Sequence, residues 1–199
     1  MKHTFGKQAK RAGIALAAVG AFAALGIGTA QAQSFASANI SVETRGEGAG
    51  GLNCSFRETG LGPYASVTYS CGAMDVGVVQ QCVYKNKPVG NPLPAVHFEN
   101  VSNAGGEGEV EALLANNSGR INATVTAALP EAGEGGGEAC TEPAALEVVA
   151  VRWCNASLVD TTNNITGASA ADVFASLAGN ATVPSCAELE LIPPTPTPH

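Results

Sequence analysis

The chain has 199 residues, of which 45% are hydrophobic and only 5% aromatic, and its formal net charge is −7 at pH 7. An acidic surface repels phosphate backbones and anionic lipid heads, so the composition argues against nucleic acid as a partner. Large apolar side chains are few, and a thin core of this kind needs covalent or other support.

The first 32 residues have the pattern of an export signal. Four basic residues between Lys2 and Arg11 precede an uncharged run over 12–30, and Ala30 and Ala32 form an A-x-A-like cleavage site. Its removal takes four of the ten basic residues and none of the seventeen acidic ones, which leaves a net charge of −11. A retained membrane anchor is the alternative, but the run is only weakly hydrophobic. We expect an extracellular protein, exported by a bacterium, with no stable membrane insertion after cleavage.

Residues 33–190 are predicted to form one all-β domain, because short alternating runs are separated by clusters of Gly, Pro and Asn. The expected strands are 39–43, 52–57, 67–71, 76–84, 96–101, 109–114, 121–127 and 146–159. The expected loops are 46–51, 85–94 and 131–143. Valines on both parities of 76–84 predict a strand that is buried on both faces.

Two hairpins are expected among these strands. Segments 52–57 and 67–71 flank the Gly60–Pro63 turn, and segments 109–114 and 121–127 flank Asn116-Asn117-Ser118-Gly119. The longest strand ends at the turn of residues 161–164.

A short C-terminal helix is expected after this turn. Ser169 and Asp172 resemble a capping arrangement, and Gly179 supplies a stop. The apolar stripe between them consists of Val173, Phe174 and Leu177. Residues 191–199 are rich in Pro and Thr and predict an extended tail. The fold class is therefore an immunoglobulin-like β-sandwich with a short C-terminal helix, stapled by disulfides.

All six cysteines follow the export signal, in a compartment where thiols oxidise. They are Cys54, Cys71, Cys82, Cys140, Cys154 and Cys186. Fifteen pairings are possible. Cys54 and Cys71 lie symmetrically about the first hairpin turn, so a cross-strand disulfide is expected, with a contribution of about 3 kcal/mol. Metal binding is the rival interpretation, but the spacings are wide and the exported chain has only His97 and His199.

Three stretches resemble a group of small secreted bacterial β-rich proteins. They are Phe56-Arg57-Glu58-Thr59-Gly60-Leu61-Gly62, the segment 82–86, and 151–155 running on to Asp160-Thr161-Thr162-Asn163. The resemblance covers most of residues 50–165. It implies a Cys82–Cys140 disulfide, which would leave Cys154 and Cys186 as the remaining pair. It supports the fold and secretion and assigns no activity.

No catalytic residue, metal ligand or cofactor is expected. His97 is interpreted as an ordinary surface or edge residue, and Glu107, Glu109 and Glu111 would project into solvent from one strand face. Calcium is the weaker alternative for four acidic sets, which we interpret as solvated loops because the chain has few aspartates. These sets are Glu43 with Glu47, Glu107 with Glu109, Glu131 with Glu134 and Glu138, and Asp160 with Asn163.

The motif Asn-x-Ser/Thr occurs eight times, which suggests either glycosylation or the outward positions of alternating strands. We favour strand composition. The leading functional hypothesis is a non-enzymatic binding or surface-associated protein, whose partner is an unknown protein, a glycan or a small apolar ligand. The alternative is a carrier of a small apolar ligand held in a cleft between the sheets, which a surface pocket lined by Trp153 and Phe98 would favour. An extracellular hydrolase with a carboxylate pair in a groove is third.

Overall fold

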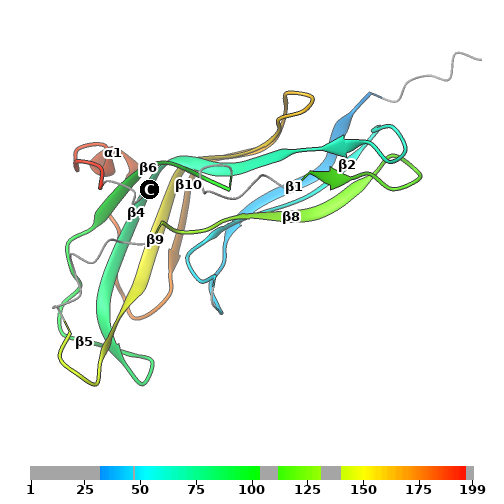
Figure 1. The fold of residues 1–199 in the computed structure, drawn as a ribbon. Helices are drawn as coiled ribbons and strands as arrows, with labels where there is room; N and C mark the ends of the chain where they lie inside the picture. The colour runs from blue at the N-terminus through cyan, green and yellow to red at the C-terminus, as the bar shows by residue number, and fades with distance from the viewer. Residues whose placement is uncertain (1–31, 47, 104–111, 131–139, 196–199) are drawn as a thin grey trace, which may run out of the picture. The chain divides into compact units, whose positions relative to one another are not determined.

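The computed structural model describes residues 32–46, 48–103, 112–130 and 140–195, and its strands all pair antiparallel (Figure 1). The three-stranded sheet has the order β1-β2-β8, and its strands are β1 (Ser34–Val42), β2 (Leu52–Thr59) and β8 (Ile121–Ala127). The five-stranded sheet has the order β10-β9-β4-β5, with β6 also paired to β4. Its strands are β4 (Tyr69–Tyr84), β5 (Lys87–Val89), β6 (Val96–Ser102), β9 (Ala145–Asp160) and β10 (Ile165–Ser176). A two-stranded sheet joins β3 (Ser66–Val67) to β7 (Leu113–Leu114).

Two strands of sixteen residues form the centre of the five-stranded sheet. β4 and β9 pair from Tyr69↔Asp160 to Val83↔Ala145. Neighbouring valines Val78 and Val79 are both buried, which confirms that this segment is covered on both faces. The chain turns after Asp160, as the sequence predicts, and then continues as the strand β10.

One face of the five-stranded sheet shares its core with the three-stranded sheet. The shared core contains Leu52 and Phe56 from β2 together with Tyr69 from β4 and Trp153 from β9, all almost completely buried. The rings of Phe56 and Tyr69 lie 4.3 Å apart between centroids. Alternation along β2 therefore turns Leu52, Cys54 and Phe56 inward and Asn53, Ser55 and Arg57 outward.

The opposite face of the five-stranded sheet is covered by residues 181–195, which we call the C-terminal strap. Val183 and Leu189 of the strap are buried against Val79 and Val149 of the sheet in a second, smaller core. The strap contains the helix α1 (Cys186–Leu189), whose capping box is formed by Ser185 and Glu188. The strap thus explains why both faces of β4 and β9 can be apolar.

Both expected hairpins are wrong in their pairing. Segment 52–57 lies in β2 and pairs with β1 and β8, whereas 67–71 enters β3 and β4 in other sheets. The turn at Asn116–Gly119 exists, since Gly119 N–H donates to the Asn116 carbonyl at 3.0 Å. Its arms nevertheless pair elsewhere, β7 with β3 and β8 with β2. Local turn residues determine where the chain bends. Which strands pair depends on the burial of their apolar faces in the complete fold.

The expected helix at residues 169–179 is also wrong, because this segment is the edge strand β10. In an extended chain Val173 and Phe174 point to opposite faces. Val173 packs against the shared core, while Phe174 is 44% exposed. Pairing with the long β9 outweighs a weak local helix signal.

Three smaller differences complete the comparison with the expected elements. β1 begins at Ser34, earlier than the expected strand 39–43. The expected strand 76–84 begins earlier as well, because β4 starts at Tyr69 and includes the end of the expected strand 67–71. The expected irregular loop 85–94 contains the short strand β5, in which Pro88 is accommodated at a sheet edge.

Among the described residues, no helix has the length and hydropathy that a membrane crossing requires.

Candidate functional site

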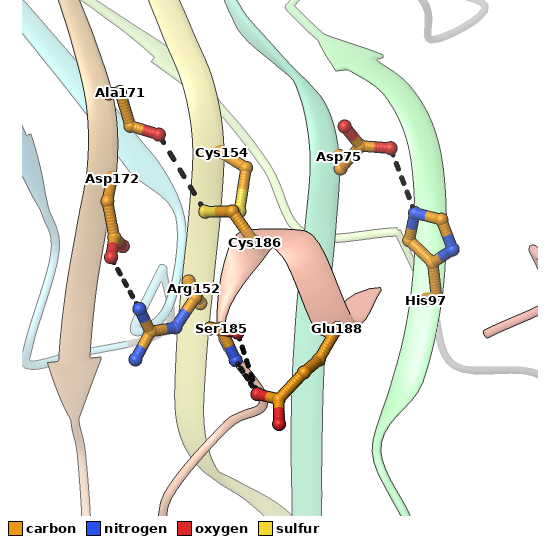
Figure 2. Close-up of a disulfide and its surroundings, with 9 residues drawn as sticks. All are labelled: Asp75, His97, Arg152, Cys154, Ala171, Asp172, Ser185, Cys186 and Glu188. Atoms are coloured by element: carbon orange, nitrogen blue, oxygen red, sulfur yellow. Dashed lines mark hydrogen bonds and ion pairs between the residues drawn. A yellow bond between two sulfur atoms is a disulfide. The ribbon is translucent and has the colours of Figure 1, made fainter. Parts of the chain in front are cut away.

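The six cysteines form three disulfides. Cys82 in β4 is bonded to Cys140. Cys154 in β9 is bonded to Cys186 at the start of α1, as Figure 2 shows. Cys54 and Cys71 are also bonded, with their Cα atoms 6.0 Å apart. This third bond joins β2 of the three-stranded sheet to β4 of the five-stranded sheet, so it is an inter-sheet bond and not a cross-strand bond within a hairpin.

The outer face of the three-stranded sheet carries a regular set of polar side chains, which we call the polar array. In register across β1, β2 and β8, its three rows are Ser37–Arg57–Asn122, Asn39–Ser55–Thr124 and Ser41–Asn53–Thr126. Eight of the nine residues are Ser, Thr or Asn, and none is acidic. The array therefore offers only uncharged hydrogen-bonding groups and one guanidinium.

Hydrogen bonds fix several side chains of the polar array. The hydroxyls of Ser55 and Thr124 lie 2.8 Å apart, and Thr126 donates to the Asn53 amide oxygen at 2.8 Å. The Asn53 amide nitrogen donates to Glu43 at 2.9 Å. A shallow hollow of about 420 Å³ lies over the array around Asn39 and Ser55. The surface is thus ordered and open to a ligand.

Strand geometry explains several of the Asn-x-Ser/Thr motifs. Residues two apart in a strand share a face, so a polar face of Asn, Ser and Thr generates the motif by itself. Asn39-x-Ser41 and Asn122-x-Thr124 arise in this way within the polar array. The same holds for Asn53-x-Ser55 on β2. This supports the interpretation as strand composition.

A buried acidic group lies at the end of the shared core. Glu58 and Asp160 are both fully buried, and the Tyr69 hydroxyl donates to Glu58 Oε2 at 2.8 Å. Burial is the largest cause of a raised pKa at Glu58, the Tyr69 hydrogen bond opposes the shift, and the negative charge of Asp160 adds to it. The pKa of Tyr69 is raised too, first by burial and then by the Glu58 carboxyl. Because these groups are shielded from solvent, we interpret them as structural.

A second polar cluster lies at the edge of the five-stranded sheet, where Figure 2 shows His97 of β6 facing Asp75 of β4. Sequence analysis places His97 at the surface or an edge. It does lie on an edge strand, but the residue is only 1% exposed because the C-terminal strap covers it. Its ring contacts Asp75 Oδ1 at 3.0 Å and the Ile192 carbonyl oxygen at 2.7 Å. The covering segment lies far along the chain, so no local signal could have revealed this burial.

The strap is also held on its other side. The Cys154–Cys186 disulfide anchors α1, and Arg152 forms an ion pair with Asp172 beside it (Figure 2). The hydroxyl and the backbone N–H of Ser185 donate to the Glu188 carboxylate and hold its pKa below the ordinary value.

The remaining candidate residues from the sequence are those of the acidic sets and of the apolar pocket. Asp160 accepts hydrogen bonds from the backbone and side chain of Asn163 at 2.9 and 2.7 Å, so this pair closes a turn. Trp153 and Phe98 are both fully buried and line no surface pocket. The other acidic candidates lie outside the described residues, apart from Glu43, which binds Asn53. These undescribed candidates are Glu47, Glu107, Glu109, Glu111, Glu131, Glu134 and Glu138.

Comparison with known proteins gives no relative from which a role could be transferred: no family model, no curated protein and no solved structure matches the chain.

Proposed function

We propose that the protein is an exported, non-enzymatic binding protein that recognises a neutral, hydroxyl-rich polymer through the polar array. The observation that carries this proposal is the in-register set of Ser, Thr and Asn side chains on the outer face of the three-stranded sheet. A polysaccharide presents repeated hydroxyl groups, each of which can both donate and accept a hydrogen bond. Of the three partner classes expected from the sequence, a protein, a glycan or a small apolar ligand, the polar array favours the glycan.

The charge distribution supports a neutral ligand. The whole chain carries a net charge of −7, yet the array contains no carboxylate and a single cation, Arg57. An anionic polymer would be repelled by the molecule as a whole. A neutral polymer meets donors and acceptors without this penalty.

The spacing of the array favours an extended ligand. Neighbouring strands lie about 4.8 Å apart, and alternate residues on one face are about 6.8 Å apart along a strand. Repeating contacts can therefore continue over three strands. Each neutral hydrogen bond contributes only about 0.5–1.5 kcal/mol net, so several must act together.

Export and a specific sandwich architecture belong to the same proposal. The basic and apolar leader with its small-residue cleavage site supports secretion, and three disulfides are compatible with an oxidising compartment. We infer an immunoglobulin-like sandwich from the inter-sheet Cys54–Cys71 bond and the buried Trp153, a combination that is typical of such domains.

The test is co-sedimentation and affinity electrophoresis of the oxidised, cleaved protein with neutral glucans and mannans, alongside anionic alginate. The middle row of the array is removed in the triple variant Asn39→Ala, Ser55→Ala, Thr124→Ala. Loss of three hydrogen bonds is expected to weaken binding about tenfold or more. The matched control is Thr166→Ala, Ser169→Ala, which removes similar exposed hydroxyls from β10 and should bind normally. Absence of binding to every neutral polymer, or equal binding by the triple variant, would reject the proposal.

A further inference from the structure

Three potential metal ligands lie together on one face at the edge of the five-stranded sheet. Asp75 of β4 pairs directly with Glu99 of β6, and His97 lies two residues before Glu99 on the same face. One ligand atom from each residue lies within 4.8 Å of the other two. His97 is buried, Asp75 is half-buried and Glu99 is exposed, so the cluster is anchored inside and open on one side.

The surroundings of His97 define which ring nitrogen can bind a ligand. Nδ1 lies 2.7 Å from the carbonyl oxygen of Ile192, and a carbonyl oxygen only accepts, so Nδ1 carries a proton. Nε2 lies 3.0 Å from the Asp75 carboxylate, which also only accepts when ionised. With Nδ1 bound to the Ile192 carbonyl, Nε2 is the ring nitrogen that faces the Asp75 carboxylate, in position to bind a shared ligand.

We propose that His97 Nε2 and the carboxylates of Asp75 and Glu99 bind one divalent transition-metal ion of the zinc class. A metal-bound histidine usually donates its other ring N–H to a backbone carbonyl or a carboxylate, and the Ile192 carbonyl fills that role for His97. Three protein ligands leave a fourth coordination position for water.

Charge and ligand type favour this class of ion. Two carboxylates beside an imidazole form a site of double negative charge, which a divalent ion neutralises. Calcium and magnesium prefer oxygen ligands alone, whereas an imidazole nitrogen suits zinc and its neighbours.

Metal binding would also hold the end of the chain in place. The His97 ring binds the Ile192 carbonyl, and the Thr195 N–H donates to the His97 carbonyl at 2.7 Å. A metal ion that fixes the ring therefore stabilises the last residues of the C-terminal strap. Because the ion binds the folded state, it should raise the thermal midpoint.

The test uses the oxidised, cleaved full chain without a histidine tag, treated with chelator and then titrated with Co²⁺ as a spectroscopic probe and Zn²⁺ as its competitor. We expect one equivalent of Co²⁺ to bind with visible absorption bands, Zn²⁺ to displace it, and Zn²⁺ to raise the melting temperature. Glu99→Gln removes an exposed ligand without disturbing the core and should weaken Zn²⁺ binding about tenfold or more. Glu147→Gln, which removes the same charge from an exposed position of β9, should bind normally.

His97→Gln is a second variant and is expected to abolish the absorption bands. Its fold is checked by circular dichroism, and the Glu99→Gln result stands independently if this variant does not fold. The proposal is overturned if no saturable Co²⁺ binding occurs, if Glu99→Gln binds as tightly as the wild type, or if both glutamate variants lose affinity equally. The last result would indicate general attraction to an acidic surface.

Discussion

At the scale of single residues, the buried carboxyl of Glu58 is the most unusual feature. Its Oε1 atom is buried without a hydrogen-bond partner in the described part of the chain, and its Oε2 accepts from Tyr69. Desolvation penalises the ionised form, so its pKa is raised above the ordinary value. Glu58 and Asp160 lie far apart in the sequence, and the fold brings both into one buried group.

The raised pKa of Glu58 predicts a specific pH dependence of stability. A folded-state pKa above the unfolded value stabilises the protein fully below the unfolded pKa, and this contribution is lost as the pH rises through the folded pKa. Glu58→Gln cannot ionise, so its free energy of unfolding should improve relative to wild type as the pH rises.

Urea denaturation of both proteins between about pH 4 and about pH 8 measures this difference. Glu147→Gln, at an exposed position, provides the control for removal of one carboxylate. A difference between Glu58→Gln and wild type that stays constant over this range would show that Glu58 does not titrate as inferred.

At the scale of elements, the sequence predicts strands better than it predicts their partners. Alternation correctly identifies β2, β6, β8 and β9 because each has one face on a core or is buried throughout. It misassigns β10 as a helix, because the small residues of this segment fit a helical period as well as a strand period. Only the pairing of β10 with β9 distinguishes the two. The polar array could be read from the alternating Ser, Thr and Asn, but its register depends on which strands meet.

The contact between the C-terminal strap and β4 depends on a residue without a side chain. A Cβ atom at Gly77 would lie 2.6 Å from Val183 Cγ1 and 2.7 Å from Leu189 Cδ1. Leu189 is fully buried and α1 is tethered by the Cys154–Cys186 bond, so neither side chain has an easy way to retreat.

We therefore expect Gly77→Ala to lower the free energy of unfolding by about 1–3 kcal/mol through overpacking. Gly62→Ala is the control, because nothing lies within 4 Å of its Cβ position, and it should be neutral or stabilising by up to about 1 kcal/mol. Chemical denaturation and limited proteolysis at the C-terminus measure the two effects. Equal stability of both variants would mean that the strap does not press on Gly77.

At the scale of the whole molecule, one buried covalent bond connects the two larger sheets. Cys54 and Cys71 are both fully buried, whereas Cys82 and Cys140 are only half-buried. The prediction of this bond rested on the symmetric placement of the two cysteines about a hairpin turn. The pairing is confirmed, but the bond joins two sheets and does not cross a hairpin. A sequence gives the spacing of cysteines, but the layer that each strand joins depends on the entire fold.

Replacement of both residues by alanine, Cys54→Ala with Cys71→Ala, is expected to be strongly destabilising. Chain entropy accounts for about 3 kcal/mol. The cavity left between the sheets adds about 1–2 kcal/mol. Urea denaturation, with retained native fold checked by near-ultraviolet circular dichroism, measures the loss. A change below about 1 kcal/mol would contradict the view that this bond supports a thin core.

The hydrogen bond from Thr195 to the His97 carbonyl has a consequence for self-association. β6 is an outer strand, and such strands expose unpaired backbone groups that can recruit another chain. The strap occupies part of this rim, and Pro193 and Pro194 just before Thr195 have no N–H with which to continue a ladder. The end of the C-terminal strap therefore blocks the addition of a further strand at β6. We expect its removal by proteolysis to expose backbone groups of β6, through which trimmed molecules would associate edge to edge.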